Sequence, residues 1–150
     1  FDILFKNRNC LVGHEFILKF KDLEKLGYSI LDVAKRLIDY GFHPPTVHWP
    51  VPHALMIEPT ETEPINELNR FVEALLNIKT ELEKFRNLSD NPVKNSPHAF
   101  YELLETWSYS YPPSIAFPEA KNNRFIPSVK RLLDSEGDRA LLVQCGCIMM

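Results

Sequence analysis

The sequence has little of what marks several common classes of protein. Its 150 residues hold 17 Lys and Arg against 20 Asp and Glu, which gives a formal net charge of −3. No cationic excess is left to neutralise a phosphate backbone or an acidic membrane surface. The longest apolar runs, such as Ala54–Ile57, are far shorter than the ~20 residues of a membrane-spanning helix. The sequence therefore predicts no nucleic-acid partner and no membrane partner.

Cysteine and glycine are also scarce. Cys10, Cys145 and Cys147 are an odd number, which does not suit a secretory disulfide framework and favours a reducing compartment. Cys145 and Cys147 lack the spacing and the second pair of a zinc site, so an incidental tail and a redox role stay as alternatives. Five glycines form no phosphate-binding loop and no Gly-x-Ser-x-Gly elbow. We expect that the chain does not run a reaction alone.

The composition and the two ends set the expected domain organisation. Residues are 45% hydrophobic and 25% charged, which predicts one globular domain with a real core over residues 1–150. The start, Phe1-Asp2-Ile3, has neither an initiator Met nor a signal core. That start suggests a fragment of a longer protein.

Hydrophobic periodicity predicts an α/β (α+β) core over about residues 1–87, in the order strand, helix, strand, helix. Residues 14–20 alternate, which predicts a strand with Phe16, Leu18 and Phe20 on one face. Residues 30–38 have helical spacing between a Ser29 cap and a left-handed Gly41. The apolar stripe of this helix comprises Ile30, Val33, Ala34, Leu37 and Ile38.

Prolines shape the second half of this core. Four of them between residues 42 and 53 forbid helix and predict an extended, rigid connector. A buried strand is expected at residues 54–58, followed by a helix with Pro64 in its first turn. The expected apolar face of that helix comprises Ile65, Leu68, Phe71, Val72, Leu75, Leu76 and Leu82. About residues 88–150 lack a period and predict an irregular wrap and tail, with a short strand at 140–143.

Few side chains point to chemistry. His43 lies between Gly41 and Pro44-Pro45, which would hold its imidazole still for acid–base work, or it packs and satisfies a carbonyl. His14-Glu15 lacks the second histidine of a zinc-protease motif, so no metal site is expected there. The carboxylates of residues 58, 61 and 63 could hold a cation or a basic partner, but acidic residues before a helix are usually caps.

Several blocks together resemble one family. Residues 32–50 (DVAKRLIDYGFHPPTVHWP) and 55–63 (LMIEPTETE) strongly resemble the C-terminal region of glycine dehydrogenase (decarboxylating), the P-protein of the glycine cleavage system. The resemblance continues in order over nearly the whole chain, through His14-Glu15, Glu67–Phe71, Asn91-Pro92, Lys94-Asn95, Pro97-His98, Trp107, Tyr111, Ala116–Pro118, Arg124-Phe125, Pro127 and Gly137–Arg139.

The resemblance implies a fold and a reaction. Its fold would be the small C-terminal domain of an aspartate-aminotransferase-like (fold type I) pyridoxal-phosphate enzyme. The complete enzyme would release CO₂ from glycine and pass the aminomethyl group to the lipoylated H-protein, as a dimer. In this family the cofactor lysine and the Gly-rich phosphate loop lie upstream, so this fragment alone would bind no pyridoxal phosphate and hold no catalytic residue.

The resemblance also implies locations. His43 and Thr46 would lie on a rigid loop facing the large cofactor domain, and His14-Glu15 would start a strand near the same interface. The system operates in a bacterial cytoplasm or a mitochondrial matrix, and the sequence does not choose between them. A competing hypothesis is a non-catalytic binding or assembly module derived from the same domain.

Overall fold

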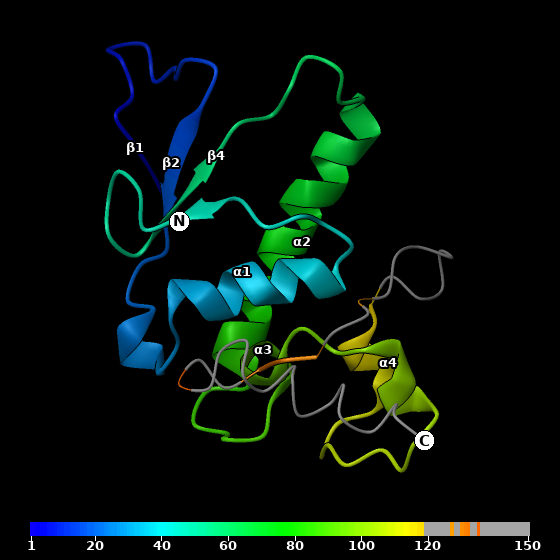
Figure 1. Ribbon diagram of the computed structural model, residues 1–150. Helices are drawn as coiled ribbons and strands as arrows, with labels where there is room; N and C mark the ends of the chain where they lie inside the picture. The colour runs from blue at the N-terminus through cyan, green and yellow to red at the C-terminus, as the bar shows by residue number, and fades with distance from the viewer. Residues whose placement is uncertain (119–126, 128–129, 133–134, 136–150) are drawn as a thin grey trace.

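A four-stranded antiparallel sheet with helices beside it forms the described part of the protein (Figure 1). The structure, a computed structural model, describes residues 1–118, 127, 130–132 and 135. The sheet has the order β1-β2-β4-β3, with β1 at Asp2–Leu4, β2 at Phe16–Lys19, β3 at Thr46–Val47 and β4 at Ala54–Ile57. The long helices are α1 (Ile30–Asp39) and α2 (Ile65–Lys84). This arrangement confirms the predicted α+β class.

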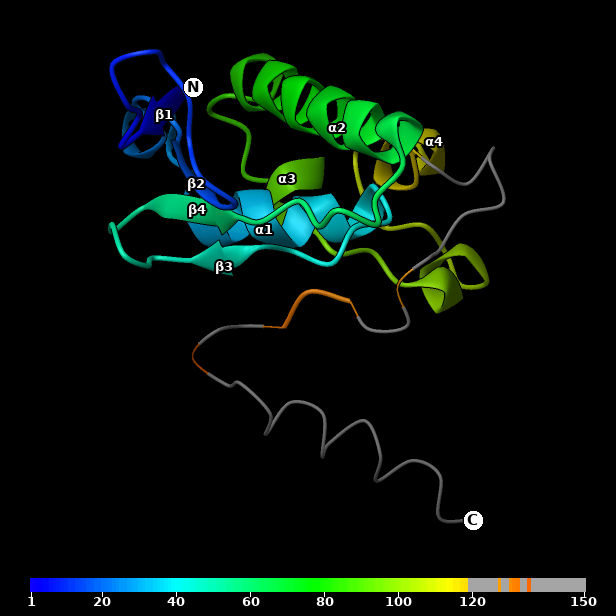
Figure 2. The same cartoon turned by 90° about the horizontal axis from the view of Figure 1, so that it is seen from above.

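Short elements make up the rest of the described chain. They are η1 (Glu24–Leu26), α3 (Pro92–Asn95), η2 (Phe100–Leu103) and α4 (Pro113–Ala116). Viewed from above, α1 and α3 lie between the edge strand β3 and α2 (Figure 2). Residues 88–118 form single turns of helix separated by loops, and the predicted wrap over residues 88–150 stays a prediction. The expected strand at 140–143, Cys145 and Cys147 lie outside the described residues.

Helix α1 begins and ends where the sequence predicts. The Ser29 hydroxyl accepts the Asp32 backbone N–H at 3.2 Å, and the Asp32 carboxylate accepts the Ser29 N–H at 2.8 Å. This reciprocal capping box satisfies two of the amides that a helix start leaves unpaired. At the other end Gly41 has φ +75°, and its N–H donates to the Ile38 carbonyl at 2.8 Å. The left-handed glycine turns the chain out of the helix.

The strands confirm most of the predicted pattern. Phe16, Leu18 and Phe20 all contact the hydrophobic core, as alternation predicts. The segment before β4 contains no helix, as its prolines require, but it is more than a connector. Thr46 pairs with Met56, one residue pair of the β3–β4 ladder, because the extended backbone that prolines favour is also strand backbone.

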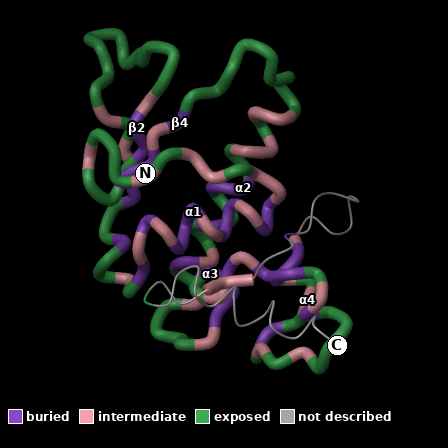
Figure 3. The backbone as a smooth tube through the Cα atoms, in the orientation of Figure 1, coloured by how far each residue is buried: buried purple, intermediate pink, exposed green. Residues whose placement is uncertain are grey.

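Helix α2 differs from the prediction in its buried face. Its buried residues are Ala74, Leu75, Ile78 and Leu82, whereas Ile65, Val72 and Leu76 are 71%, 54% and 50% exposed. Pro64 is the N-cap and not part of the first turn. The two helices differ in length: the 10 residues of α1 span about 15 Å and the 20 residues of α2 about 30 Å. One helix therefore covers only part of the other, and Figure 3 shows little burial along the first turns of α2.

A buried polar network centred on Arg36 lies where α1, α2 and the 96–118 segment meet. Arg36 donates from Nε and Nη2 to the two carboxylate oxygens of Glu81, both at 2.8 Å. Its Nη1 donates to Asp39 at 2.9 Å and to the Ala116 carbonyl at 3.1 Å, and Nη2 also donates to the Ile115 carbonyl at 2.6 Å. All five guanidinium N–H groups thus have an acceptor.

The partners of Arg36 stabilise its charged state. Burial by itself lowers the pKa of Arg36, but hydrogen bonding and attraction to Glu81, and then attraction to Asp39, raise that pKa above its ordinary value. The side chains of Arg36 and Asp39 are both 0% exposed. A buried cation of this kind is tolerated only when it is paired and fully hydrogen-bonded.

Asp39 extends the Arg36 network to His98, which is also fully buried. One Asp39 oxygen accepts the His98 backbone N–H at 2.8 Å, and the other lies 2.8 Å from Nδ1 of the imidazole. A carboxylate acceptor places the imidazole proton on Nδ1, so Nε2 accepts from the Tyr111 hydroxyl at 2.7 Å. Burial, the largest cause, raises the pKa of Tyr111 and keeps that hydroxyl protonated.

Replacing Arg36 by methionine tests the weight of this network. We expect Arg36→Met to lower the free energy of unfolding by about 3 kcal/mol or more, because it leaves buried carboxylates and carbonyls without donors. Urea denaturation followed by circular dichroism measures the change. The matched control is Arg86→Met at an exposed position, where a change within about 0.5 kcal/mol is expected. Similar losses in both variants would contradict a special role for Arg36.

Candidate functional site

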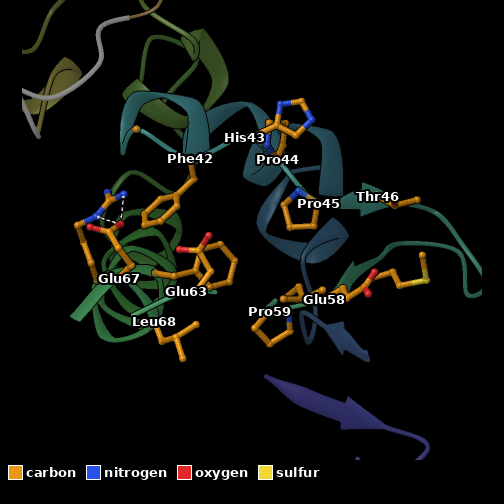
Figure 4. Close-up of a pocket in the computed structure, with 15 residues that line it drawn as sticks. Phe42, His43, Pro44, Pro45, Thr46, Glu58, Pro59, Glu63, Glu67 and Leu68 are labelled. Atoms are coloured by element: carbon orange, nitrogen blue, oxygen red, sulfur yellow. Dashed lines mark hydrogen bonds and ion pairs between the residues drawn. The ribbon is translucent and has the colours of Figure 1, made fainter. Parts of the chain in front are cut away.

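A groove of about 480 Å³ opens between the loop that follows α1 and the first turns of α2 (Figure 4). Its lining comes from three segments of the chain: the Gly41–Thr46 loop, the end of β4 with the residues after it, and α2. The lining residues are Gly41, Phe42, His43, Pro44, Pro45, Thr46, Met56, Ile57, Glu58, Pro59, Glu63, Glu67, Leu68, Arg70 and Phe71.

One wall of the groove is built by stacked side chains. The rings of Phe42 and Phe71 meet edge to face at 5.1 Å, and the Arg70 guanidinium lies 3.6 Å from the centre of the Phe42 ring. Arg70 donates to the Tyr40 carbonyl at 2.7 Å, and two of its nitrogens lie 2.8 and 2.9 Å from one Glu67 oxygen. Because Arg70 is held from both sides, this wall is preorganised.

The opposite wall is stiff and carries negative charge. Pro44, Pro45 and Pro59 restrict the backbone there, and the Glu58 side chain lies beside Pro59 (Figure 4). Glu58 is exposed on this wall, and the exposed Glu63 lines the groove on the side of Phe42 and Glu67 (Figure 4). Since Arg70 is already paired with Glu67, the free charge of the groove is negative. The site favours cationic or neutral polar groups over anions.

The structure brings some of the predicted site residues together. His43 and Thr46 are exposed and both line the groove, with the His43 ring beside Pro44 at its edge (Figure 4). His14 and Glu15 do not line it; their side chains are 80% and 44% exposed and lie 4.0 Å apart.

Strand register relates Glu15 to the groove. Phe16 pairs with Ile57, so Glu15, the residue before Phe16, lies at the same end of the sheet as Glu58, the residue after Ile57. His14-Glu15 therefore precedes β2 and does not begin it. The proposed location of all these residues at one interface stays a prediction.

The groove does not fit a phosphorylated cofactor. Its lining contains no lysine, and its arginine is bound to Glu67 and to a backbone carbonyl. The carboxylates of Glu58 and Glu63 would repel a phosphate. Among the described residues no group of three His, Cys, Asp or Glu side chains could hold a metal ion, and no helix is long and apolar enough to cross a membrane.

Sequence reasoning missed the polar residues that matter most. Asp32, Arg36 and Asp39 recur at helical spacing, a pattern that usually marks a solvated face, yet all three are buried. His98 gave no signal of its own beyond its place beside a proline and in the family resemblance. Arg70 was named only as part of the resembling block Glu67–Phe71, and its stacking on Phe42 could not be predicted because Phe42 lies in a different element. Only the tertiary structure brings these side chains together.

The fold and the groove define a small α+β domain with a preorganised, acidic groove. Residues 1–98 match the family model described as glycine dehydrogenase, C-terminal domain. The chain belongs to this family, and the resemblance seen in the sequence is confirmed.

Three curated relatives carry the name glycine dehydrogenase (decarboxylating). The protein of Salmonella arizonae is 47% identical over 156 residues, which cover 100% of this chain and 16% of that protein. Those of Photorhabdus laumondii and Proteus mirabilis are 48% and 46% identical, cover 98% and 99% of this chain, and are also matched over 16% of their length. The chain thus spans about one sixth of its relatives.

Gly41 sets the direction of the loop that forms the groove, so its replacement is informative. At φ +75° a Cβ would be strained, although its nearest atom, Nη1 of Arg70, would be 3.7 Å away. We expect Gly41→Ala to lower the free energy of unfolding by about 1 kcal/mol and Gly41→Asn by less, because asparagine tolerates left-handed backbone. Thermal unfolding gives the comparison. Equal losses for alanine and asparagine would show that backbone strain is not the cause.

Proposed function

We propose that this chain serves as the C-terminal domain of a complete glycine decarboxylase and is not catalytic alone. The observation that carries the proposal is near-half identity over the whole chain combined with coverage of only 16% of each relative. The complete protein would act on glycine, release CO₂ and transfer the aminomethyl group to the lipoylated H-protein. Its compartment would be a bacterial cytoplasm or a mitochondrial matrix.

The division of labour follows from the groove. Pyridoxal phosphate, the electron sink for this chemistry, would be held by the remainder of the protein, since the lining of the groove does not suit it. This domain would be the small domain of a fold type I enzyme that forms a dimer. Its contribution would be a shaped, water-excluding surface against the large domain.

The groove is the part of this domain that would face the large domain. Arg70 and Phe42 lock one wall and three prolines stiffen the other, so the loop with His43 and Thr46 is presented in one conformation. Such rigidity is what a surface that positions groups across an interface needs. The exposed carboxylates of Glu58 and Glu63 would meet basic groups there.

Reassembly tests the proposed function. The Salmonella arizonae protein lacking the segment that matches this chain is mixed with the chain, and glycine-dependent CO₂ release is measured with lipoylated H-protein. We expect at least a tenfold gain over the truncated protein alone, with the destabilised Arg36→Met chain as a control that should give a smaller gain. No gain would sink the proposal and favour a non-catalytic binding or assembly module.

His43 separates a functional groove from a merely structural one. We expect His43→Ala to lower the activity of the reassembled enzyme about tenfold or more. The free energy of unfolding should change by less than about 0.5 kcal/mol, because the side chain is exposed. His53→Asn, at an exposed histidine outside the groove, is the control and should leave activity unchanged. Parallel losses of activity and stability in His43→Ala would identify a packing residue.

A further inference from the structure

Helix α2 carries a second apolar surface that nothing in the described structure covers. It comprises Ile65, Leu68, Val72 and Leu76, called here the α2 stripe. Three of these side chains are 50% to 71% exposed, and Leu68 is half-buried. Their spacing of three, four and four residues places them on one side of the helix, the spacing by which one helix packs on another.

The first part of the α2 stripe is exposed because α2 is longer than α1. Leu76, between the buried Leu75 and Ile78, is exposed because it lies on another side of the helix. The buried residues of α2 all lie between positions 74 and 82, and the earlier turns extend past α1 (Figure 1). Those turns touch the body of the domain mainly through Phe71, which packs on Phe42, and Arg70, which binds the Tyr40 carbonyl. The side of the same turns that carries Ile65 and Val72 remains exposed.

The stripe also adjoins the groove, because Leu68 belongs to both. Two apolar sides on one exposed helix are unusual in a domain that stands alone, where the outward side is normally polar. Exposed apolar side chains gathered on one element mark interaction sites. The continuity of stripe and groove indicates one extended contact surface.

We propose that the α2 stripe packs against a helix from the remaining part of the full-length polypeptide. This inference rests on the proposed function. Relatives extend far beyond the matched segment, which is 16% of their length, so ample chain exists to supply the partner. Exposed Glu61 and Glu63 precede the N-terminal end of the stripe. The partner helix would therefore present apolar side chains flanked by Lys or Arg at that end.

A cleavable chimera tests the contact. In the Salmonella arizonae protein this chain replaces the matching segment, with a site for a sequence-specific protease at the junction. Glycine-dependent CO₂ release is measured before cleavage, and the affinity between the two pieces after it. We expect Leu76→Glu to weaken that affinity about 30-fold. Asn77→Glu adds the same charge at the next residue, about 100° around the helix, and should bind like the wild type.

Two further measurements keep the test decisive. Circular dichroism of the isolated chains shows whether Leu76→Glu folds like Asn77→Glu, and the neutral Leu76→Gln should also weaken the affinity. Sedimentation of the isolated chain tests a second copy as the occupant. A dimer that Leu76→Glu dissociates and Asn77→Glu does not would overturn the proposal.

The outcomes separate the two proposals. If the uncleaved chimera is active and Leu76→Glu binds as tightly as the wild type, the stripe contact is wrong and the proposed function stands. Immediate separation of the wild-type pieces also overturns the contact. An inactive chimera whose pieces still separate more readily with Leu76→Glu than with Asn77→Glu would support the contact and contradict the proposed function.

Discussion

The buried guanidinium of Arg36 is the constraint on which the described structure depends. Removing a cation from water is costly, and the cost is offset only if every donor finds an acceptor. Here the acceptors come from Glu81 on α2, Asp39 on α1, and the carbonyls of Ile115 and Ala116. One side chain thus fixes how three segments, distant in sequence, sit together. Asp39 also fixes the position of His98, whose ring is hydrogen-bonded to Tyr111.

The Arg36 network also determines the shape of the groove. Tyr40, next to Asp39, donates its hydroxyl to Glu81 and offers its carbonyl to Arg70. Burial, and then Glu81, raise the pKa of Tyr40, so the phenol stays protonated. The end of α1 is therefore held at two points of Tyr40: its hydroxyl is bound to the Arg36 network through Glu81, and its carbonyl is bound to Arg70. The loop that carries His43 starts from a fixed point, which explains how an exposed loop keeps a defined groove.

Local patterns predicted the elements well and their burial less well. Ser29 and Gly41 marked both ends of α1, and alternation found β2, because caps and side-chain periods are local. The exposed side of α2 and the buried Arg36 could not be read this way. The sequence pattern of an apolar residue does not show whether a packing partner is present in the chain, as the exposed Val72 illustrates. The local sequence around a polar residue likewise does not show whether its side chain is solvated or hydrogen-bonded to a buried carboxylate. Gly41 and the neighbouring prolines were enough to single out His43, whereas Thr46 was named only through the family resemblance. The groove that both residues line was not predicted.

The acceptors of Arg36 also bear on where this domain can be divided. The family model ends at residue 98, yet two of the guanidinium's acceptors are at residues 115 and 116, and the partner of the His98 ring is Tyr111. A chain cut at the end of the matched region would leave two of the five Arg36 N–H groups and Nε2 of His98 without these partners. The buried polar network of this domain therefore extends to at least residue 116, beyond the end of the match to the family model.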